Sequence, residues 1–497
     1  MAEAVQSASP AVQAGHCVHY ERRRPEETVL YQLVQEHAET FFAQVEAETG
    51  EGLPEFVKAE FEAFLECGVL AQGFLRVRCA ECAHEKLVAF SCKKRGFCPS
   101  CGSRRMAETA AHRVDHVIPP VPVRQWVVSF PIPLRFLLAA HPQLLSPVLG
   151  VVNRAISTFL IKPAGLNRVA AQTGALTLIQ RFGSAANLNI PLHCLYLDGV
   201  YDITEDVPVF HPVRSPSAEQ VQTLLNKIIQ RIMRLLIRTA HSVEEHETLF
   251  MAENTAETNT ALAPLQAAAC TYRIALGPRA GRKVVTLQTV PSSAAPNTPN
   301  TAQRCAQEQG FSLHADVCCA LNQRNKLEQL CRYITRPAIA HERLSINHNG
   351  DVVLQLKTPY KDGTTPVVMS PLEFMQRLAA LVPRPRLNLI RFHGVLAPNA
   401  KIRSLITPGR PVLDKDAAVA PHRASHHWTA GRMSWARLLK RVFDIDIEHC
   451  PHCGGTLKII AAIEDPAVIT KILAHLGLPP RAPPRIPARP LELFETP

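Results

Sequence analysis

Apolar residues recur at helical spacing in the first part of the chain. Between residues 26 and 70 they form two series, which begin near Val29 and Phe56. Because residues three and four positions apart lie on one face of a helix, this spacing predicts two or more amphipathic helices. Residues 106–118 show the same spacing and predict another helix.

The stretch from about residue 120 to residue 400 has a different pattern. Short apolar or alternating runs in it are typical of strands, and amphipathic segments at 216–240 and 321–336 predict helices between them. Strands mixed with helices in this way indicate an α+β fold. A loop rich in Ser, Pro and Asn is expected at 292–303. The strand-like runs read WVVSF, LTLIQRF, HCLYLDGVYDI, KVVTLQTV, DVVLQLK and LNLIRFHGVL.

The two ends of the chain have the composition of tails and linkers. Residues 1–25 are rich in Ala, Ser and Gln, and we expect them to be poorly ordered. A polar linker at 406–432 precedes a compact module at 433–477, and a tail rich in Pro and Arg follows at 478–497. Between these ends, the pattern predicts two larger domains, at 26–118 and at 119–405.

The composition favours a polyanionic partner. The chain of 497 residues has 54 Lys and Arg against 43 Asp and Glu, a net charge of +11. This balance favours nucleic acid or an acidic membrane surface. No apolar run reaches the roughly 18–20 residues of a membrane span, and the first residues do not resemble a secretory signal. We therefore expect a cytoplasmic protein without membrane contact, in which grouped cysteines indicate metal rather than disulfides.

Two CxxC pairs lie close together in residues 79–102, which read CAECAHEKLVAFSCKKRGFCPSCG. One CxxC turn offers two thiolates, and two such knuckles complete the tetrahedral shell of Zn²⁺. The spacing therefore predicts a structural zinc ribbon, because four thiolates leave no open position for catalysis. Cys92 or His84 could replace one of the four thiolates. The predicted ligands are Cys79, Cys82, Cys98 and Cys101.

Basic residues surround these two knuckles. A hairpin stiffened by metal and rich in positive charge is suited to contacts with the DNA backbone. Arginine in particular binds phosphate through two parallel hydrogen bonds. The candidate DNA-binding residues are Lys93, Lys94, Arg95, Arg104 and Arg105.

A second cysteine pair, Cys450 and Cys453, lies in the C-terminal module. Two thiolates are half of a zinc shell, and nearby histidines could complete it. The alternative is a reduced turn without metal, and the sequence leaves both interpretations open. The histidines are His449 and His452 in the module, and His426 and His427 in the linker.

Two further segments contain single residues with catalytic chemistry. Strand alternation places His193 on an otherwise apolar face, where a lone histidine is more often a satisfied core residue than a ligand. Tyr333 lies off the apolar stripe of a helix, between Arg332 and Arg336. Arginines beside a tyrosine suit a nucleophile that attacks phosphate, although a tyrosine packed at a helix end explains the pattern as well.

Five stretches, taken in this order, resemble the rolling-circle transposases of the ISCR type, which are relatives of insertion sequence ninety-one. The combination is highly specific, and the stretches together span most of residues 70–475. They read RCAECAHEKLVAFSCKKRGFCPSCGSRRMAETAAH (78–112), GSAANLNIPLHCLYLDGVY (183–201), LCRYITRPAIAHERL (330–344), MSPLEFMQRLAALVPRPRLNLIRFHGVLAPNAKIR (369–403) and MSWARLLKRVFDIDIEHCPHCGGTLKIIAAI (433–463).

The resemblance implies an HUH-type nuclease, in which an antiparallel sheet with flanking helices carries a His–hydrophobic–His metal site. Mg²⁺ or Mn²⁺ would polarise the scissile phosphate of single-stranded element-end DNA. A tyrosine would attack that phosphate and leave a 5′-phosphotyrosine and a free 3′-hydroxyl. Carried onto this chain, Tyr333 is the nucleophile and His193 is the second histidine of the motif. Gln329 stands where two-tyrosine relatives have another tyrosine and is a candidate third ligand, and Arg332 and Arg336 would contact DNA.

One position departs from the motif, because Pro191 stands where its first histidine is expected. Proline offers no ligand and removes a backbone N–H from a strand, and one imidazole with neutral oxygens would hold Mg²⁺ poorly. The sequence therefore supports two hypotheses, an active transposase and a catalytically impaired relative that still binds DNA. A zinc-ribbon transcription regulator is a third, and it leaves residues 120–400 without a role.

Overall fold

The chain forms two compact units. The first contains Met1–Pro25, Cys67–Phe90 and Arg432–Ala482, and the second contains Glu26–Glu66, Ser91–Gly431 and Pro483–Pro497. Each unit therefore joins segments that the sequence pattern assigned to separate domains. The computed structural model describes residues 18–19, 23–167, 169–239, 242–245, 248–251, 261–288, 304–357, 359, 363–408, 435–443 and 445–490. The predicted loop at 292–303, and most of the predicted N-terminal tail and linker, lie outside these residues.

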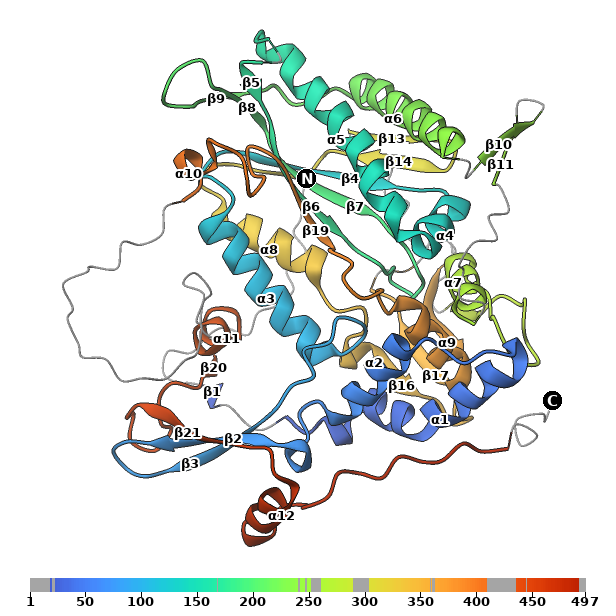
Figure 1. Cartoon of the computed structure of the whole chain (residues 1–497), viewed down its shortest axis with the longest axis vertical. Coiled ribbons are helices and arrows are strands. Elements are labelled where there is room, and N and C mark those ends of the chain that lie inside the picture. The colour runs from blue at the N-terminus through green and yellow to red at the C-terminus, as the bar shows by residue number, and fades with distance from the viewer. Residues whose placement is uncertain are drawn as a thin grey trace. The chain divides into compact units, whose positions relative to one another are not determined.

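A seven-stranded antiparallel sheet forms the centre of the second unit (Figure 1). The strand order is β13-β14-β4-β7-β6-β19, with β15 also paired to β4. This arrangement confirms the predicted α+β fold with antiparallel sheets. The bounds are β4 (Val123–Ser129), β6 (Gly174–Ile179), β7 (Leu192–Leu197), β13 (Cys305–Glu308), β14 (Phe311–His314), β15 (Cys318–Cys319) and β19 (Ile390–Gly394).

Helices cover both faces of this sheet, which explains why every residue of β6 and β7 is buried. On one face, Leu195 and Leu197 of β7 share a core with residues of α3 (Pro99–His116) and α8 (Arg324–Thr335). On the other face, the Tyr196 hydroxyl donates to the Asn153 side chain of α5 (Leu145–Ile161). Because side chains alternate along a strand, His193 lies on the same face as α3 and α8.

Two contacts fasten α8 to α3. Arg324, the first residue of α8, donates to the carbonyl oxygens of Ile118 at 2.8 Å and Pro119 at 3.1 Å, just after the end of α3. A Cβ atom at Gly102 of α3 would lie 2.9 Å from Cβ of Pro337, which follows α8. The absence of a side chain at Gly102 therefore allows the close approach of the two segments.

The predicted N-terminal helices are confirmed as α1 (Val29–Thr49) and α2 (Glu55–Glu66). The Thr28 hydroxyl accepts the Tyr31 N–H at the start of α1, and Gly50 ends the helix with a φ of 73°. Such caps satisfy backbone groups that a helix leaves without partners. Phe97, in the segment that leads into α3, packs its ring 4.8 Å from that of Phe61 on α2. This contact joins the α1–α2 pair to the start of α3.

The remaining elements of the second unit extend around the sheet. The helices are α4 (Ile132–Ala140), α6 (Ala218–Arg238), α7 (Leu262–Thr271), α9 (Pro371–Leu381) and α10 (Arg403–Ile406). Three smaller sheets contain β5 (Ala171–Gln172), β8 (Gly199–Asp202) and β9 (Val209–Pro212); β10 (Ser242–Glu245) and β11 (Thr248–Met251); and β12 (Val285–Gln288), β16 (Leu344–Ile346), β17 (Val352–Gln355) and β18 (Thr364–Met369).

One helical stretch in the described part of the chain, Pro142–Ala164, is long and apolar enough to cross a membrane. The sequence pattern had indicated no such run. Within the protein, 56% of the apolar window of this stretch is buried. It contains α5, whose Asn153 bonds to the central sheet, so packing against β7 explains its apolar character.

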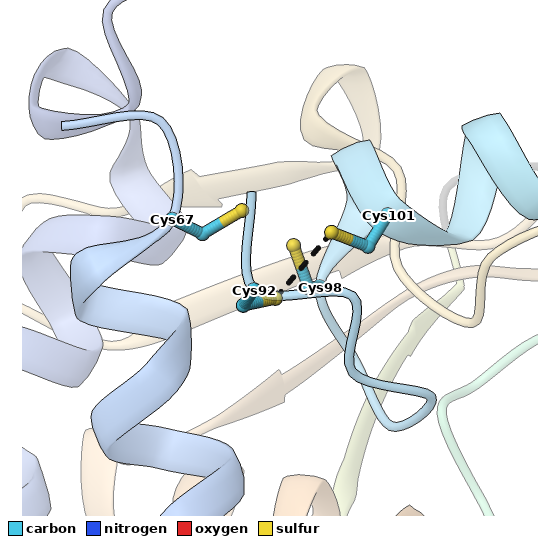
Figure 2. A group of neighbouring side chains, drawn as sticks. All are labelled: Cys67, Cys92, Cys98 and Cys101. Atoms are coloured by element: carbon cyan, nitrogen blue, oxygen red, sulfur yellow. Dashed lines mark hydrogen bonds between the residues drawn. The ribbon is translucent and has the colours of Figure 1, made fainter. Parts of the chain in front are cut away.

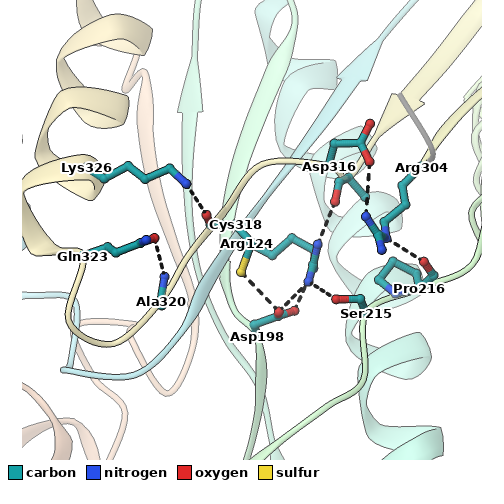
Figure 3. A network of polar contacts seen from close by, with 11 residues as sticks. Arg124, Asp198, Ser215, Pro216, Arg304, Asp316, Cys318, Ala320, Gln323 and Lys326 are labelled. Atoms are coloured by element: carbon teal, nitrogen blue, oxygen red, sulfur yellow. Dashed lines mark hydrogen bonds and ion pairs between the residues drawn. The ribbon is translucent and has the colours of Figure 1, made fainter. Parts of the chain in front are cut away.

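A buried ion pair connects the strands with the loops at one end of the sheet (Figure 3). The Arg124 guanidinium donates to both carboxylate oxygens of Asp198, at 2.9 and 2.7 Å. It also donates to the Ser215 hydroxyl at 2.7 Å and to the Ala315 carbonyl at 2.9 Å. Because all these bonds share one guanidinium, Arg124 fixes β4, the residue after β7 and two loops in one arrangement.

The first unit is built on a three-stranded sheet of order β21-β2-β3, with bounds β2 (Phe74–Cys79), β3 (Glu85–Ala89) and β21 (Leu457–Ile463). α12 (Pro466–His475) packs on this sheet, with Ile469 and Leu473 in a small core beside Leu70 and Phe74. The unit also contains α11 (Trp435–Phe443), and the short pair β1 (Val18–His19) and β20 (Ile445–Asp446).

Candidate nucleic-acid interface and metal centres

A cavity of about 280 Å³ in the second unit lies where the segment before α3, the end of β6 and the end of α8 come together. Four arginines line it, and no acidic residue is among its lining side chains. The cavity therefore has the electrostatic character of an anion-binding site. The arginines are Arg95, Arg105, Arg181 and Arg336.

Arg181 is the most buried of the four arginines, with 5% of its surface exposed. Burial lowers its pKa to about 10, and the positive charges of Arg384 and Arg95 act in the same direction. Its Nε atom has no hydrogen-bond partner, and no ion pair to Arg181 forms within the described part of the chain. A buried charge without a counter-ion is costly, so an anionic ligand in the cavity would stabilise this side chain.

The basic segment before α3 is held in place by its own hydrogen bonds. The Arg105 guanidinium donates to the carbonyl oxygens of Lys93 at 2.9 Å and Lys94 at 3.1 Å. Arg95 donates to the Leu387 carbonyl at 2.6 Å. The carboxylate of Glu60 accepts the Gly96 N–H, and burial raises the pKa of Glu60. Arg95 and Arg105 are thus positioned at the cavity by contacts on two sides.

Tyr333 lies on the outer side of α8 with 47% of its surface exposed. The guanidinium carbon of Arg336 is 4.5 Å from the centroid of the tyrosine ring, and Nζ of Lys357 is 4.4 Å from it. Cations over an aromatic face attract the ring and also any phosphate beside it. Arg336 lines the cavity and Tyr333 does not, so Arg336 is the side chain that connects the tyrosine ring to the cavity.

The other predicted DNA-binding residues surround this region without lining the cavity. Lys93 is exposed, with a φ of 55°, and Lys94 is half-buried. Arg104 and Arg332 are half-buried on α3 and α8. Their roles in DNA binding stay predictions.

His193 is enclosed between two glutamine side chains. Its Nδ1 atom is 3.0 Å from Nε2 of Gln125, and its Nε2 atom is 3.3 Å from Oε1 of Gln180. These contacts are satisfied when Gln125 donates to Nδ1 and the Nε2–H of the ring donates to Gln180. Burial and then the positive charge of Arg336 lower the pKa of His193 to about 4. The ring is therefore neutral near pH 7.

The surroundings of His193 do not fit a site for Mg²⁺ or Mn²⁺. These ions prefer carboxylate and water oxygens, but the side chains that contact the ring are the two neutral amides. Pro191 lies directly before the first residue of β7 and offers no ligand. Gln329 is exposed on α8. In the described ranges, no group of three or more His, Cys, Asp or Glu side chains that could share an ion includes His193.

Cysteine side chains gather in two separate groups. In the first, the sulfur atoms of Cys92 and Cys98, before α3, and of Cys101, in the first turn of α3, lie together with that of Cys67, which directly follows α2 (Figure 2). The four atoms are all within 4.8 Å of one another. The Sγ atoms of Cys92 and Cys101 are 3.4 Å apart. This is far longer than a disulfide bond and close to the separation in a tetrahedral thiolate shell.

The second group contains Cys79, Cys82, Cys450 and Cys453, whose sulfur atoms also lie within 4.8 Å of one another. Hydrogen bonds to the Cys79 sulfur from the backbone N–H of Cys82 and then of Glu81, the latter at 3.4 Å, lower the pKa of Cys79 to about 7. The four cysteines predicted to share one ion are therefore divided. Cys79 and Cys82 join the C-terminal pair, whereas Cys98 and Cys101 join Cys92 and Cys67.

The sequence missed several of the residues that the structure brings to these sites. Arg181 had a signal, because it lies two positions after the end of the apolar strand β6, where a charged side chain is unusual. Cys67 and Lys357 had none, since each is far along the chain from the residues it meets. His84, an alternative ligand in the sequence, stacks its ring 4.2 Å from that of His452 and belongs to neither cysteine group.

Comparison with known families finds matches in two regions of the chain. Residues 33–130 match the transposase zinc-binding domain, and residues 174–403 match a transposase family. No curated protein and no solved structure matches the chain. The two matches define a DNA-processing enzyme of the transposase class, whose partner is DNA. The chain belongs to the transposases related to insertion sequence ninety-one and carries their N-terminal zinc-binding domain.

Proposed function

We propose that this transposase works by a rolling-circle mechanism in the cytoplasm and that Tyr333 cleaves single-stranded DNA at the ends of its element. The observation that carries this proposal is the exposed Tyr333 ring, which Arg336 and Lys357 both contact, with Arg336 also lining an arginine-rich cavity. The cavity has positive charge but no acidic lining residue, which suits a polyanionic strand.

Each basic side chain has a role in this proposal. Arg181 and Arg336 bind the phosphate next to the phenol, and Arg95 and Arg105 bind the strand further along the cavity. Their charges stabilise the negative charge that develops on the phosphate oxygens during attack. Gln125, Gln180 and neutral His193 form a hydrogen-bonded group at the sheet that keeps Gln180 at the cavity wall.

The chemical step is a transesterification that conserves the number of phosphate esters. The Tyr333 oxygen forms a bond to phosphorus, and the bond from phosphorus to the 3′ oxygen breaks. The phenolic proton is transferred, and the released strand carries it as a 3′-hydroxyl group. The product is a 5′-phosphotyrosine, which a 3′-hydroxyl can later attack in reverse.

The test is a search for a covalent adduct with single-stranded oligonucleotides from the element ends, labelled on the 5′-phosphate side. We expect an adduct that survives denaturing electrophoresis with the unmodified chain and none with Tyr333→Phe. Tyr201→Phe is the matched control, because its ring packs in the protein interior against Phe210. An equal adduct with Tyr333→Phe would show that another residue is the nucleophile.

A second candidate is a catalytically impaired relative that binds element ends without cutting them. The enclosure of His193 by two amides and the absence of a ligand at Pro191 favour it. It predicts specific DNA binding without an adduct at any concentration of Mg²⁺ or Mn²⁺. An adduct that appears only in Pro191→His would support this second candidate, and an adduct with the unmodified chain would exclude it.

A further inference from the structure

The CxxC turns at Cys79–Cys82 and Cys450–Cys453 have the same local geometry. In each, the backbone N–H two residues after the second cysteine donates to the sulfur of that cysteine, from His84 to Cys82 and from Gly455 to Cys453. The residue after the second cysteine has a positive φ in both turns, 60° at Ala83 and 74° at Gly454. Turns of this shape point two thiolates in one direction.

Strand pairing brings the two turns face to face. β2 pairs antiparallel with β21 from Phe74 opposite Ile463 to Cys79 opposite Leu457. The Ala80 N–H continues this pairing by donating to the Thr456 carbonyl at 3.2 Å. A Cβ atom at Gly455 would lie 3.1 Å from the Cys79 sulfur, so glycine allows the two turns to approach.

The distances between the sulfur atoms fit one tetrahedral metal ion. Zinc–thiolate bonds of about 2.3 Å place the sulfur atoms of a regular tetrahedron about 3.8 Å apart. Cys79 and Cys453 are 3.5 Å apart, Cys82 and Cys450 are 3.4 Å apart, and all four atoms lie within 4.8 Å. A disulfide would need about 2.05 Å.

We propose that Cys79, Cys82, Cys450 and Cys453 bind a zinc ion of their own, separate from any ion held at Cys92, Cys98 and Cys101. Cys450 and Cys453 lie outside both matched family regions, at 33–130 and 174–403. This ion is shared by two segments 374 positions apart in the chain and fastens the C-terminal turn and β21 to the β2–β3 hairpin. The inference does not depend on the nuclease function.

The second zinc ion has a structural consequence for its unit. Among the described residues of the unit, the buried members of the apolar core beside it are Leu70, Phe74, Ile469 and Leu473. So small a core supplies little stabilisation, and small domains of this kind usually need metal or disulfides. Binding of zinc also offsets the conformational entropy lost when such distant segments are joined.

The experiment counts zinc in the purified full chain by elemental analysis and native mass spectrometry. We expect two zinc ions per chain, and one in Cys450→Ser/Cys453→Ser. Cys79→Ser/Cys82→Ser should lose the same ion, so the fourfold variant should still hold one. Cys92→Ser/Cys98→Ser should lose the other ion. Cys270→Ala/Cys305→Ala, in which neither residue belongs to a group, is the matched control and should keep both.

Two readouts keep the inference open to contradiction even if a variant folds poorly. Reconstitution with Co²⁺ should give thiolate-to-cobalt absorption that falls by about half in Cys450→Ser/Cys453→Ser. Hydrogen exchange should then quicken in β2, β3 and β21 and stay unchanged in α8. Two zinc ions retained in Cys450→Ser/Cys453→Ser, or loss of both in the fourfold variant, would overturn the proposal. Neither outcome bears on the adduct of Tyr333.

Discussion

Arg181 combines burial with the absence of a counter-ion. Its neighbours contribute further positive charge, from Arg95 and Arg384, and none of the cavity-lining side chains is acidic. A residue selected only for stability would not be an arginine here, because an apolar side chain of similar length avoids the cost of desolvation. We therefore regard Arg181 as a ligand-binding residue whose presence destabilises the protein without DNA.

Arg181→Met should consequently have opposite effects on binding and on stability. We expect the affinity for single-stranded DNA to fall about tenfold and the salt-dependence slope to decrease by about 0.7, the value for one phosphate contact. The free energy of unfolding should stay the same or rise. Fluorescence anisotropy and denaturant titrations measure the two effects. Arg214→Met, at an exposed position away from the cavity, is the control. A large loss of stability in Arg181→Met would contradict this interpretation.

His193 makes stability depend on pH in a specific direction. Its pKa is about 4 in the folded protein and near 6.5 when unfolded. The unfolded state therefore takes up a proton first as pH falls, so the contribution is fully present above pH 6.5 and is lost towards pH 4. The loss is on the order of 3 kcal/mol.

Substitution of His193 should remove this part of the pH dependence. We expect the free energy of unfolding to fall less between pH 7 and pH 4.5 in His193→Gln than in the unmodified chain. The fluorescence of Trp126, which is fully buried on the neighbouring strand β4, reports the unfolding of this sheet. His211→Gln, at an exposed site, should behave like the unmodified chain, and an identical pH profile in His193→Gln would refute the assignment.

Among secondary-structure elements, a few polar contacts decide how helices and strands meet. Arg324 bonds to the carbonyl groups after α3 and so sets the position of α8, which carries Tyr333. Arg124 and Asp198 join β4 to the residue after β7 in the same way. Both arginines are partners of groups distant in the chain, and neither belongs to the proposed DNA site.

Removal of one partner of the Arg124–Asp198 pair should be more harmful than removal of both. Asp198→Asn leaves a buried guanidinium without a counter-ion, so we expect a loss of about 3–5 kcal/mol. The double variant Arg124→Met/Asp198→Leu should lose less, because no buried charge is left unpaired. Denaturant unfolding followed through Trp126 compares them. A double variant as unstable as the sum of its single variants would show that the pair does not interact as described.

For the whole molecule, the net charge of +11 and the arginine cavity favour a salt-dependent association with DNA. Four arginine–phosphate contacts on a single strand predict a slope of about −3 in a plot of log affinity against log salt concentration. Anisotropy titrations between low and physiological salt measure this slope. A slope near zero would mean that the cavity does not bind the phosphate backbone.

Local sequence pattern was enough to predict the fold class and the family of this protein. Alternation and helical spacing predicted the α+β fold, and the resemblance to a transposase family agreed with the family matches. Predictions from local pattern are correct here because they depend on residues only a few positions apart, as in the period of a strand or the hydrogen bonds of a CxxC turn.

Tertiary structure alone decided which local features work together. It divided the two predicted zinc knuckles between different partners, placed Arg181 in a cavity and enclosed His193 between two amides. The pairing of Cys79 with Cys453 depends on the register of β2 against β21, across 374 positions of chain. Spacing within a motif fixes the shape of each turn, but the choice of partner is made by long-range strand pairing and packing, which no local pattern encodes.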